Sequence, residues 1–256
     1  MKKYHAGDIN IIKDKIFARD NRFDVRIQDN TVIAVYLPYN LEFVYIPGGI
    51  YNKGLSFEER QQAREINPAI VFDEDEMVCE NNVEVSDFLI TRTPVLNSFA
   101  GRYMKRDCFY GEDFFTAYLK KDEVDLLCHQ LNLRLPTETE WEYSVRAGST
   151  ELFTFGKKLP GEEQLEKWLS SDFSDLNCLN CNYFGLYGIY SGVWCSDHYK
   201  KNENSLETRD FVIKGGGAYF WPWQDEEWIW CISAMRMSSE GLVDGECGCR
   251  LVYDLH

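Results

Sequence analysis

The chain has 256 residues, of which 42 are acidic and 27 are basic, so its net charge is −15 with histidine taken as neutral. Its length corresponds to one large domain or two small ones. The contents of 45% hydrophobic and 15% aromatic residues exclude a disordered chain. Because nucleic acids and anionic membranes are bound by basic surfaces, the acidic balance argues against both as partners.

The beginning of the chain lacks the apolar stretch that a secretory signal contains. The longest window without charge, residues 177–196, holds too much Asn, Gly and Ser to cross a bilayer. Nine cysteines are present, which is an odd number. Without a signal we expect a reducing compartment, where cysteines are free thiols or metal ligands rather than disulfides. The sequence therefore predicts a cytoplasmic protein.

The first forty residues predict a β-hairpin. Residues 23–28 and 31–37 have strand composition, with Asp29-Asn30 as the turn between them, and Pro38 ends the second strand. We expect residues 1–40 to form an extension packed against a main domain of residues 41–256.

Strand and helix patterns continue to residue 90. Residues 43–46 predict a strand that runs into a Pro-Gly-Gly turn. Residues 55–67 have helical composition, with Ser56 as the candidate N-cap. Residues 83–90 alternate in the manner of a single strand.

Two short helices are predicted in the middle of the chain. Residues 120–132 place their apolar side chains on one helical face. Thr137, with Glu140 three residues later, forms a capping box that begins the second helix. From about residue 150 onward, loops and short turns dominate. Strand patterns recur in two segments, residues 211–214 and 249–253. The pattern indicates the α+β class, with two short helices, short strands and long loops.

Six segments match the motifs of one protein family in their order along the chain. They include Phe-Val-Tyr-Ile-Pro-Gly-Gly at 43–49, Leu-Arg-Leu-Pro-Thr-Glu-Thr-Glu-Trp-Glu-Tyr at 133–143 and Gly-Cys-Arg-Leu-Val at 248–252, together with residues 83–97, 184–194 and 214–216. In these segments the chain resembles the formylglycine-generating enzyme (sulfatase-modifying factor) family. The resemblance runs from about residue 41 to the end, and it implies the family's variant of the C-type lectin fold.

The resemblance also locates the family's oxidase site. Members that oxidise a sulfatase cysteine hold copper(I) on two cysteines separated by four residues, because soft thiolates suit this soft ion. With Ala234-Met235-Arg236 as the anchor, these positions fall on Trp223 and Trp228. Indole does not ligate copper as a thiolate does. The resemblance therefore implies that the oxidase site is absent, and it argues against copper as a cofactor.

The family's other metal sites also differ here. Where its calcium-binding stretch has Asn and Glu, this chain has Gly192 and Cys195. Calcium prefers oxygen ligands, so the comparison argues against calcium as well. Relatives in the ergothioneine pathway bind iron through an additional histidine-bearing domain, which this chain with its four histidines does not match.

A tryptophan-rich segment occupies the region of the missing cysteine pair. Its two Trp-x-Trp pairs would each place both indoles on one face of a strand, and the acidic residues between them favour an exposed loop. Because tryptophan is frequent in binding hot spots, the segment predicts a recognition surface, and packing of half the rings into the core is an equal alternative. The candidate ligand-binding residues are Tyr219, Trp221, Trp223, Asp225, Glu227, Trp228 and Trp230.

The remaining chemistry-bearing residues give weaker signals. Two cysteine pairs could enclose a structural zinc ion if they meet, and are free thiols otherwise: Cys178 with Cys181, and Cys247 with Cys249. His129 is interpreted as a surface or half-buried residue, and so is His198, although Asp197 beside it could orient a base. Five charged residues are interpreted as structural, the first three through ion pairs around the helix start: Arg134, Glu140, Glu142, Arg236 and Arg250.

The leading hypothesis is a non-catalytic module that binds a protein, a small molecule or a sugar through the Trp-rich region, since long loops on a rigid base tolerate substitution. The alternative is a copper-dependent thiol oxidase with Cys231 and another cysteine rearranged into the site. A third interpretation is a regulatory subunit that docks through residues 1–40. The family also contains retroelement-diversified variable proteins with a C-terminal ligand surface, a comparison to which the tryptophans fit poorly.

Overall fold

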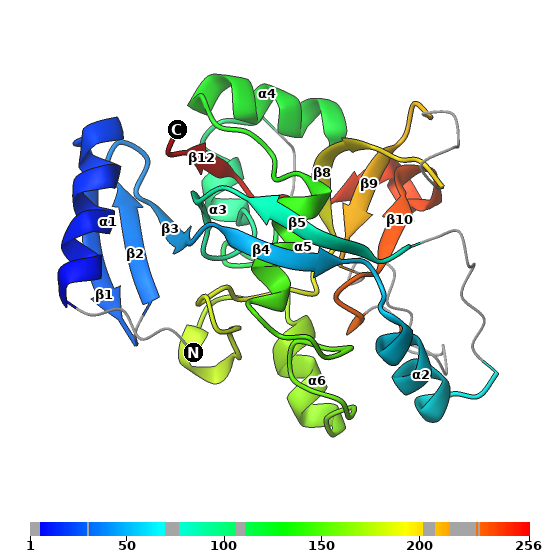
Figure 1. Cartoon of the computed structure of the whole chain (residues 1–256). Helices are drawn as coiled ribbons and strands as arrows, with labels where there is room; N and C mark the ends of the chain where they lie inside the picture. Colours follow the sequence, from blue (N-terminus) through cyan, green and yellow to red (C-terminus); the bar gives the residue numbers. More distant parts are fainter. Residues whose placement is uncertain are drawn as a thin grey trace.

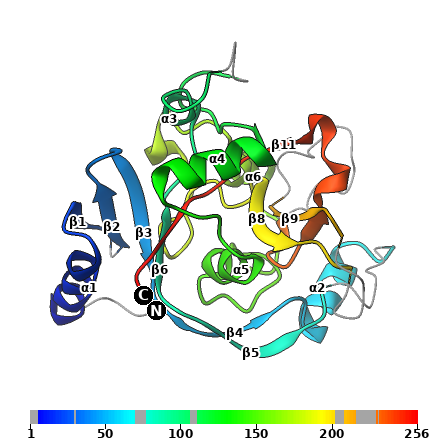
Figure 2. The ribbon, with the colours of Figure 1, turned by 90° about the horizontal axis from the view of Figure 1, so that it is seen from above.

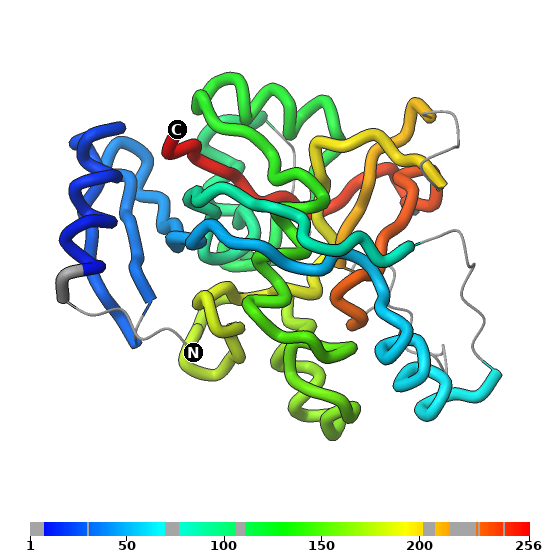
Figure 3. Tube along the Cα trace, viewed as in Figure 1, coloured from blue at the N-terminus to red at the C-terminus, as the bar shows by residue number. Residues whose placement is uncertain are grey.

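The computed structural model describes residues 6–29, 31–69, 77–105, 111–201, 208–215, 229 and 231–256. Its largest sheet is antiparallel and has the strand order β1-β2-β3-β6-β12. These strands are Phe23–Gln28, Thr31–Tyr36, Leu41–Ile46, Phe88–Thr91 and Val252–Asp254. The first and last strands of the chain thus share one sheet. Figure 3 shows these two parts, in blue and red, near one another, and the rings of Phe23 and Tyr253 lie 5.0 Å apart.

The predicted N-terminal hairpin is present as β1 and β2, and β2 continues the sheet by pairing with β3. A helix that the sequence analysis missed, α1 (Ala6–Arg19), packs beside this hairpin (Figure 1). Ile12 and Ile16 are its buried apolar residues, whereas Ile11 and Phe17 are exposed. Because its apolar residues are not confined to one face, the periodic signal of this helix is weak.

The single strand predicted over residues 83–90 is wrong. β5 (Glu80–Val85) pairs with β4 (Gly49–Lys53), and β6 belongs to the five-stranded sheet. The break falls at Asp87, which accepts hydrogen bonds from Lys15 Nζ at 2.6 Å and from the Tyr45 hydroxyl at 2.8 Å. The strand pattern is interrupted because this carboxylate fastens α1 to the sheet.

Replacing Asp87 with asparagine is expected to lower the free energy of unfolding at pH 7 by about 1–2 kcal/mol, because hydrogen bonds to a charged partner are lost. Burial by itself raises the pKa of Asp87. The hydrogen bonds from Lys15 and Tyr45 lower the pKa by more than burial raises it, so the net pKa lies below the ordinary value. Such a carboxylate stabilises the fold above about pH 4 and loses this contribution as the pH falls through its folded-state pKa. Urea denaturation at pH 7 and pH 3 should therefore show a larger difference at pH 7. Asp24→Asn, at an exposed position on β1, is the control, and an equal loss at both pH values would contradict the assignment.

The helices predicted near residues 55–67, 120–132 and 137 are confirmed as α2 (Phe57–Ile66), α4 (Lys121–Leu131) and α5 (Glu138–Arg146). Ser56 and Thr137 cap α2 and α5, each in a capping box with the glutamate three residues later. Two further helices, α3 (Asn97–Ala100) and α6 (Glu162–Leu169), lie in segments for which no helix was predicted. Within the described residues, none of the helices combines the length and apolar character needed to span a bilayer.

Helix α5 lies in the middle of the molecule. Viewed from above, it is bordered by the β4–β5 ribbon on one side and by β8 (Val193–His198) and β9 (Phe211–Lys214) on another (Figure 2). β9 also pairs with β10 (Arg236–Ser238), and β7 (Leu119–Lys120) pairs with β11 (Glu246–Cys247). Trp141 of α5 is almost fully buried in one of the two apolar clusters of the core. This central position brings α5 within reach of residues far away in sequence.

Candidate functional site

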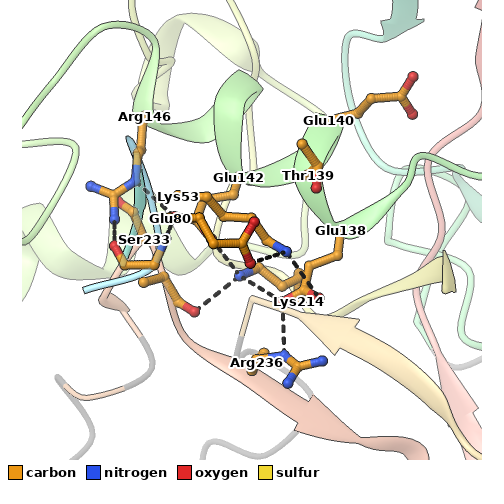
Figure 4. Close-up of polar contacts among 12 residues, drawn as sticks. Lys53, Glu80, Glu138, Thr139, Glu140, Glu142, Arg146, Lys214, Ser233 and Arg236 are labelled. Atoms are coloured by element: carbon orange, nitrogen blue, oxygen red, sulfur yellow. Dashed lines mark hydrogen bonds and ion pairs between the residues drawn. The ribbon is translucent and has the colours of Figure 1, made fainter. Parts of the chain in front are cut away.

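A cavity of about 420 Å³ opens beside α5, bordered by β4, β5, β8 and the start of β10. Its lining carries cationic side chains (Lys53, Lys200, Lys201 and Arg236) and acidic ones (Glu80, Glu138, Glu142 and Asp197). Lys53 Nζ lies 3.7 Å from Glu80 Oε1 and 3.8 Å from Glu138 Oε2 (Figure 4). The cavity is therefore strongly polar and contains charges of both signs.

Glu142 is the centre of a buried ion network at this cavity (Figure 4). Its Oε1 accepts hydrogen bonds from Arg146 Nε at 2.9 Å and from the Gly54 amide at 2.8 Å, and its Oε2 accepts one from Lys214 Nζ at 3.1 Å. Burial by itself raises the pKa of the Glu142 carboxyl, but the charges of Lys214 and Arg146 outweigh it and the net pKa is lowered. Glu142 is thus an ionised carboxylate at neutral pH.

Arg146 connects α5 to the chain between β4 and α2. Its Nη1 donates to Glu59 Oε1 at 2.7 Å, and its Nη2 donates to the Gly54 carbonyl at 2.6 Å. Glu59 in turn accepts a hydrogen bond from the Ser56 amide, which begins α2. The side chains of Arg146 and Glu59 are about 5% exposed or less. The network therefore fixes the start of α2 against α5.

Lys214 and Arg236 anchor the two ends of a long segment to α5. They are opposite each other in the β9–β10 register, where the chain leaves and re-enters this sheet. Lys214 Nζ donates to Glu142 and, at 3.0 Å, to the Ala234 carbonyl. Arg236 Nε lies 2.8 Å from Glu138 Oε1. The segment between β9 and β10, which contains the predicted recognition surface, thus begins and ends on residues that are ion-paired to α5.

The predicted recognition residues themselves, Tyr219, Trp221, Trp223, Asp225, Glu227, Trp228 and Trp230, lie outside the described residues, so this surface stays a prediction. The nearest described residue before them is Gly215, with φ of +71°. A Cβ at this position would lie 2.5 Å from the Ser191 carbonyl oxygen. Glycine is needed here because it adopts positive φ without strain and leaves room for this close approach.

The two cysteine pairs of the predicted zinc site lie in different environments. Cys178 and Cys181 are exposed, at and after the short helix η1 (Leu176–Cys178), whereas Cys247 and Cys249 are fully buried. Burial raises the pKa of the Cys247 and Cys249 thiols. Across the described ranges, no group of three or more His, Cys, Asp or Glu side chains is placed to hold a metal ion. The geometry therefore gives no support to the predicted zinc site.

Cys195 and Cys231, the second of which is the cysteine of the alternative oxidase hypothesis, are both fully buried in the same apolar cluster. Burial raises the pKa of the Cys195 thiol well above its ordinary value. Because the thiolate is the species that ligates copper, burial of this thiol disfavours ligation. Asp197 accepts a hydrogen bond from the Glu138 amide at 2.6 Å, and the His198 ring stacks on Phe211 at 4.4 Å. Asp197 and His198 thus each have a structural contact of their own.

A model of the sulfatase-modifying factor enzyme 1-like domain matches residues 108–255, which is more than half of the chain. The chain belongs to this family. The formylglycine-generating enzymes of Mus musculus and Bos taurus are 33% identical over 115 residues and 31% identical over 116 residues. Each match covers 35% of this chain and 31% of the relative, so the chain spans about a third of the length of the curated relatives it matches.

Two solved structures have the fold of this family member. Treponema denticola variable protein 1 has a TM-score of 0.58 at 15% identity, over 90% of this chain and 98% of that one. PvdO from Pseudomonas aeruginosa has a TM-score of 0.57 at 18% identity, over 83% and 94%. Together with the few helices and short antiparallel strands, these likenesses confirm the predicted α+β, C-type lectin-like fold of the formylglycine-generating enzyme type.

Lys53 and Lys214 belong to the site of this family member, although their sequence positions did not predict it. One signal was available: Glu138 and Glu142 are four residues apart, which places both carboxylates on one face of α5. Lys214 also ends an apolar strand directly before three glycines. The structural interpretation of Arg236 agrees with its ion pair to Glu138.

Proposed function

We propose that this chain is a non-catalytic binding module whose ligand, a protein or a small molecule such as a sugar, contacts the Trp-rich segment between β9 and β10. The observation that carries the proposal is the double anchoring of this segment, through Lys214 to Glu142 and through Arg236 to Glu138, at the edge of a polar cavity. Rigid ends limit the conformational entropy that a recognition loop loses on binding.

The thiols near this region also favour binding over oxidation. The family's copper-binding positions correspond to Trp223 and Trp228 in this sequence. Cys195 and Cys231 are buried, which keeps them from a substrate thiol. The eight described cysteines form no disulfide with one another, which is in keeping with a reducing, cytoplasmic setting as part of the proposal.

The test compares three variants of the full chain on peptide and glycan arrays and in a copper(I) titration with oxygen-consumption measurements on a cysteine peptide. We expect array ligands to be lost in Trp223→Ala and in Trp228→Ala and to be kept in Cys231→Ser, with binding unaffected by a chelator. Loss of one hot-spot tryptophan should weaken binding about thirtyfold or more. One copper ion per chain that disappears in Cys231→Ser, together with oxygen consumption, would overturn the proposal in favour of a thiol oxidase.

A further inference from the structure

A second cavity, of about 1000 Å³, lies on the other side of the ion network. Arg146 and Glu59 line this second cavity, whereas Gly54 and Glu142 line the first one. Since Arg146 is hydrogen-bonded to all three of these residues, the network forms the wall between the two cavities. The second cavity is therefore separate from the first.

Four aromatic rings form a continuous wall of this second cavity. The ring centroids of Tyr51 and Tyr143 are 5.3 Å apart, those of Tyr143 and Phe184 6.0 Å, and those of Phe184 and Tyr183 6.1 Å. The hydroxyls of Tyr51 and Tyr143 donate to the carbonyls of Thr139 and Pro47. Because these two hydroxyls already have partners, Tyr51 and Tyr143 offer a ligand their aromatic surface rather than their polar ends.

The charges that remain available in this cavity are mainly negative. Arg146 and Glu59 neutralise each other and are buried. Glu151 Oε2 is buried and has no hydrogen-bond partner among the described residues, and Lys157 Nζ, whose side chain is 65% exposed, lies 3.8 Å from it. Glu58 is exposed and forms no ion pair with the described part of the chain. The carboxylates of Glu151 and Glu58 are thus available to a ligand. Lys157 is bound to Glu151 only weakly.

We propose that the second cavity binds a small organic cation, an ammonium or guanidinium group on an apolar body. Aromatic faces attract cations through their quadrupole, and the carboxylates of Glu151 and Glu58 supply the opposite charge. The net charge of −15 raises the local concentration of cations around the protein. The volume also lies at the upper end of that of small-molecule sites. The cation would displace Lys157 from Glu151 and place its apolar part against Tyr183 and Phe184.

The test uses a matched pair of probes on the full chain. Choline carries a quaternary ammonium group, and 3,3-dimethyl-1-butanol is its neutral isostere. Saturation-transfer NMR and calorimetry at low salt should show choline bound at least about tenfold more tightly than the alcohol, as expected for a desolvated cation–π contact. Agmatine, a guanidinium probe, should compete with choline.

Variants decide whether this cavity is responsible. Tyr183→Ala, at a residue that is 40% exposed, and Glu151→Gln should each weaken choline binding by about threefold to tenfold. Glu163→Gln, on the exposed face of α6, is the matched control and should leave the affinity unchanged. Equal binding of choline and its neutral isostere, binding of neither cation, or unchanged affinity in both cavity variants would overturn the proposal. None of these results bears on the Trp-rich segment, because none of the substituted residues lies in it.

Discussion

The variant Glu142→Gln is expected to lower the free energy of unfolding by about 3–5 kcal/mol, because removing one partner of a buried ion pair leaves the other charge uncompensated. Glu142 is 1% exposed and binds both Lys214, which is fully buried, and Arg146. Glutamine keeps the shape of the side chain and the hydrogen bond from Gly54. The expected loss of stability therefore measures the effect of removing the negative charge. Urea denaturation followed by tryptophan fluorescence measures it.

The control and the coupling test use the same method. Glu163→Gln breaks an ion pair of the same i,i+4 spacing, but the Glu163 side chain is 88% exposed, so a change below about 0.5 kcal/mol is expected. The double variant Glu142→Gln, Lys214→Met should recover part of the loss, because the buried lysine charge is removed as well. A loss below about 1 kcal/mol in Glu142→Gln would show that the network does not stabilise the fold.

Arg250→Ala should have a similar effect, a loss of about 3–5 kcal/mol. The Arg250 side chain is 1% exposed and donates to the carbonyls of Thr91, Arg92, Tyr187 and Gly188. Burial lowers the pKa of this guanidinium. The four carbonyl oxygens accept its hydrogen bonds and so stabilise its positive charge. Alanine leaves a cavity in the core and leaves these carbonyls without their partner.

A lysine at this position separates the charge from the geometry. Because an ammonium group is compact and lacks the planar fork of a guanidinium, Arg250→Lys should still lose more than half as much stability as Arg250→Ala. Arg209→Ala, at an exposed position, provides the surface control and should change the stability by less than about 0.5 kcal/mol. Full stability of Arg250→Lys would mean that charge alone is needed at this position.

Local sequence patterns predicted the helices whose first turns are fixed by residues close to them in the sequence. The capping boxes at Ser56 and Thr137 lie within four residues of sequence, and both helices begin where these motifs place them. Helix α6 was missed although its first turn is acidic, because it lies in a loop-rich region and has Gly161 rather than a side-chain cap at its start. Residues 83–90 were predicted as one strand, but the structure divides them at Asp87, which is bound by Lys15, 72 residues earlier in the chain.

The sequence by itself determined the family and the lectin-like fold, since six motifs in order are a property of the sequence alone. It also showed that tryptophans occupy the positions where the resemblance places the copper-binding cysteines. Only the tertiary structure decided that Glu142 of α5 pairs with Lys214, 72 residues later, and that Cys247 and Cys249 are buried whereas Cys178 and Cys181 are exposed. The physical reason is that ion pairing and burial depend on partners brought together by packing, which spacing along one chain does not specify.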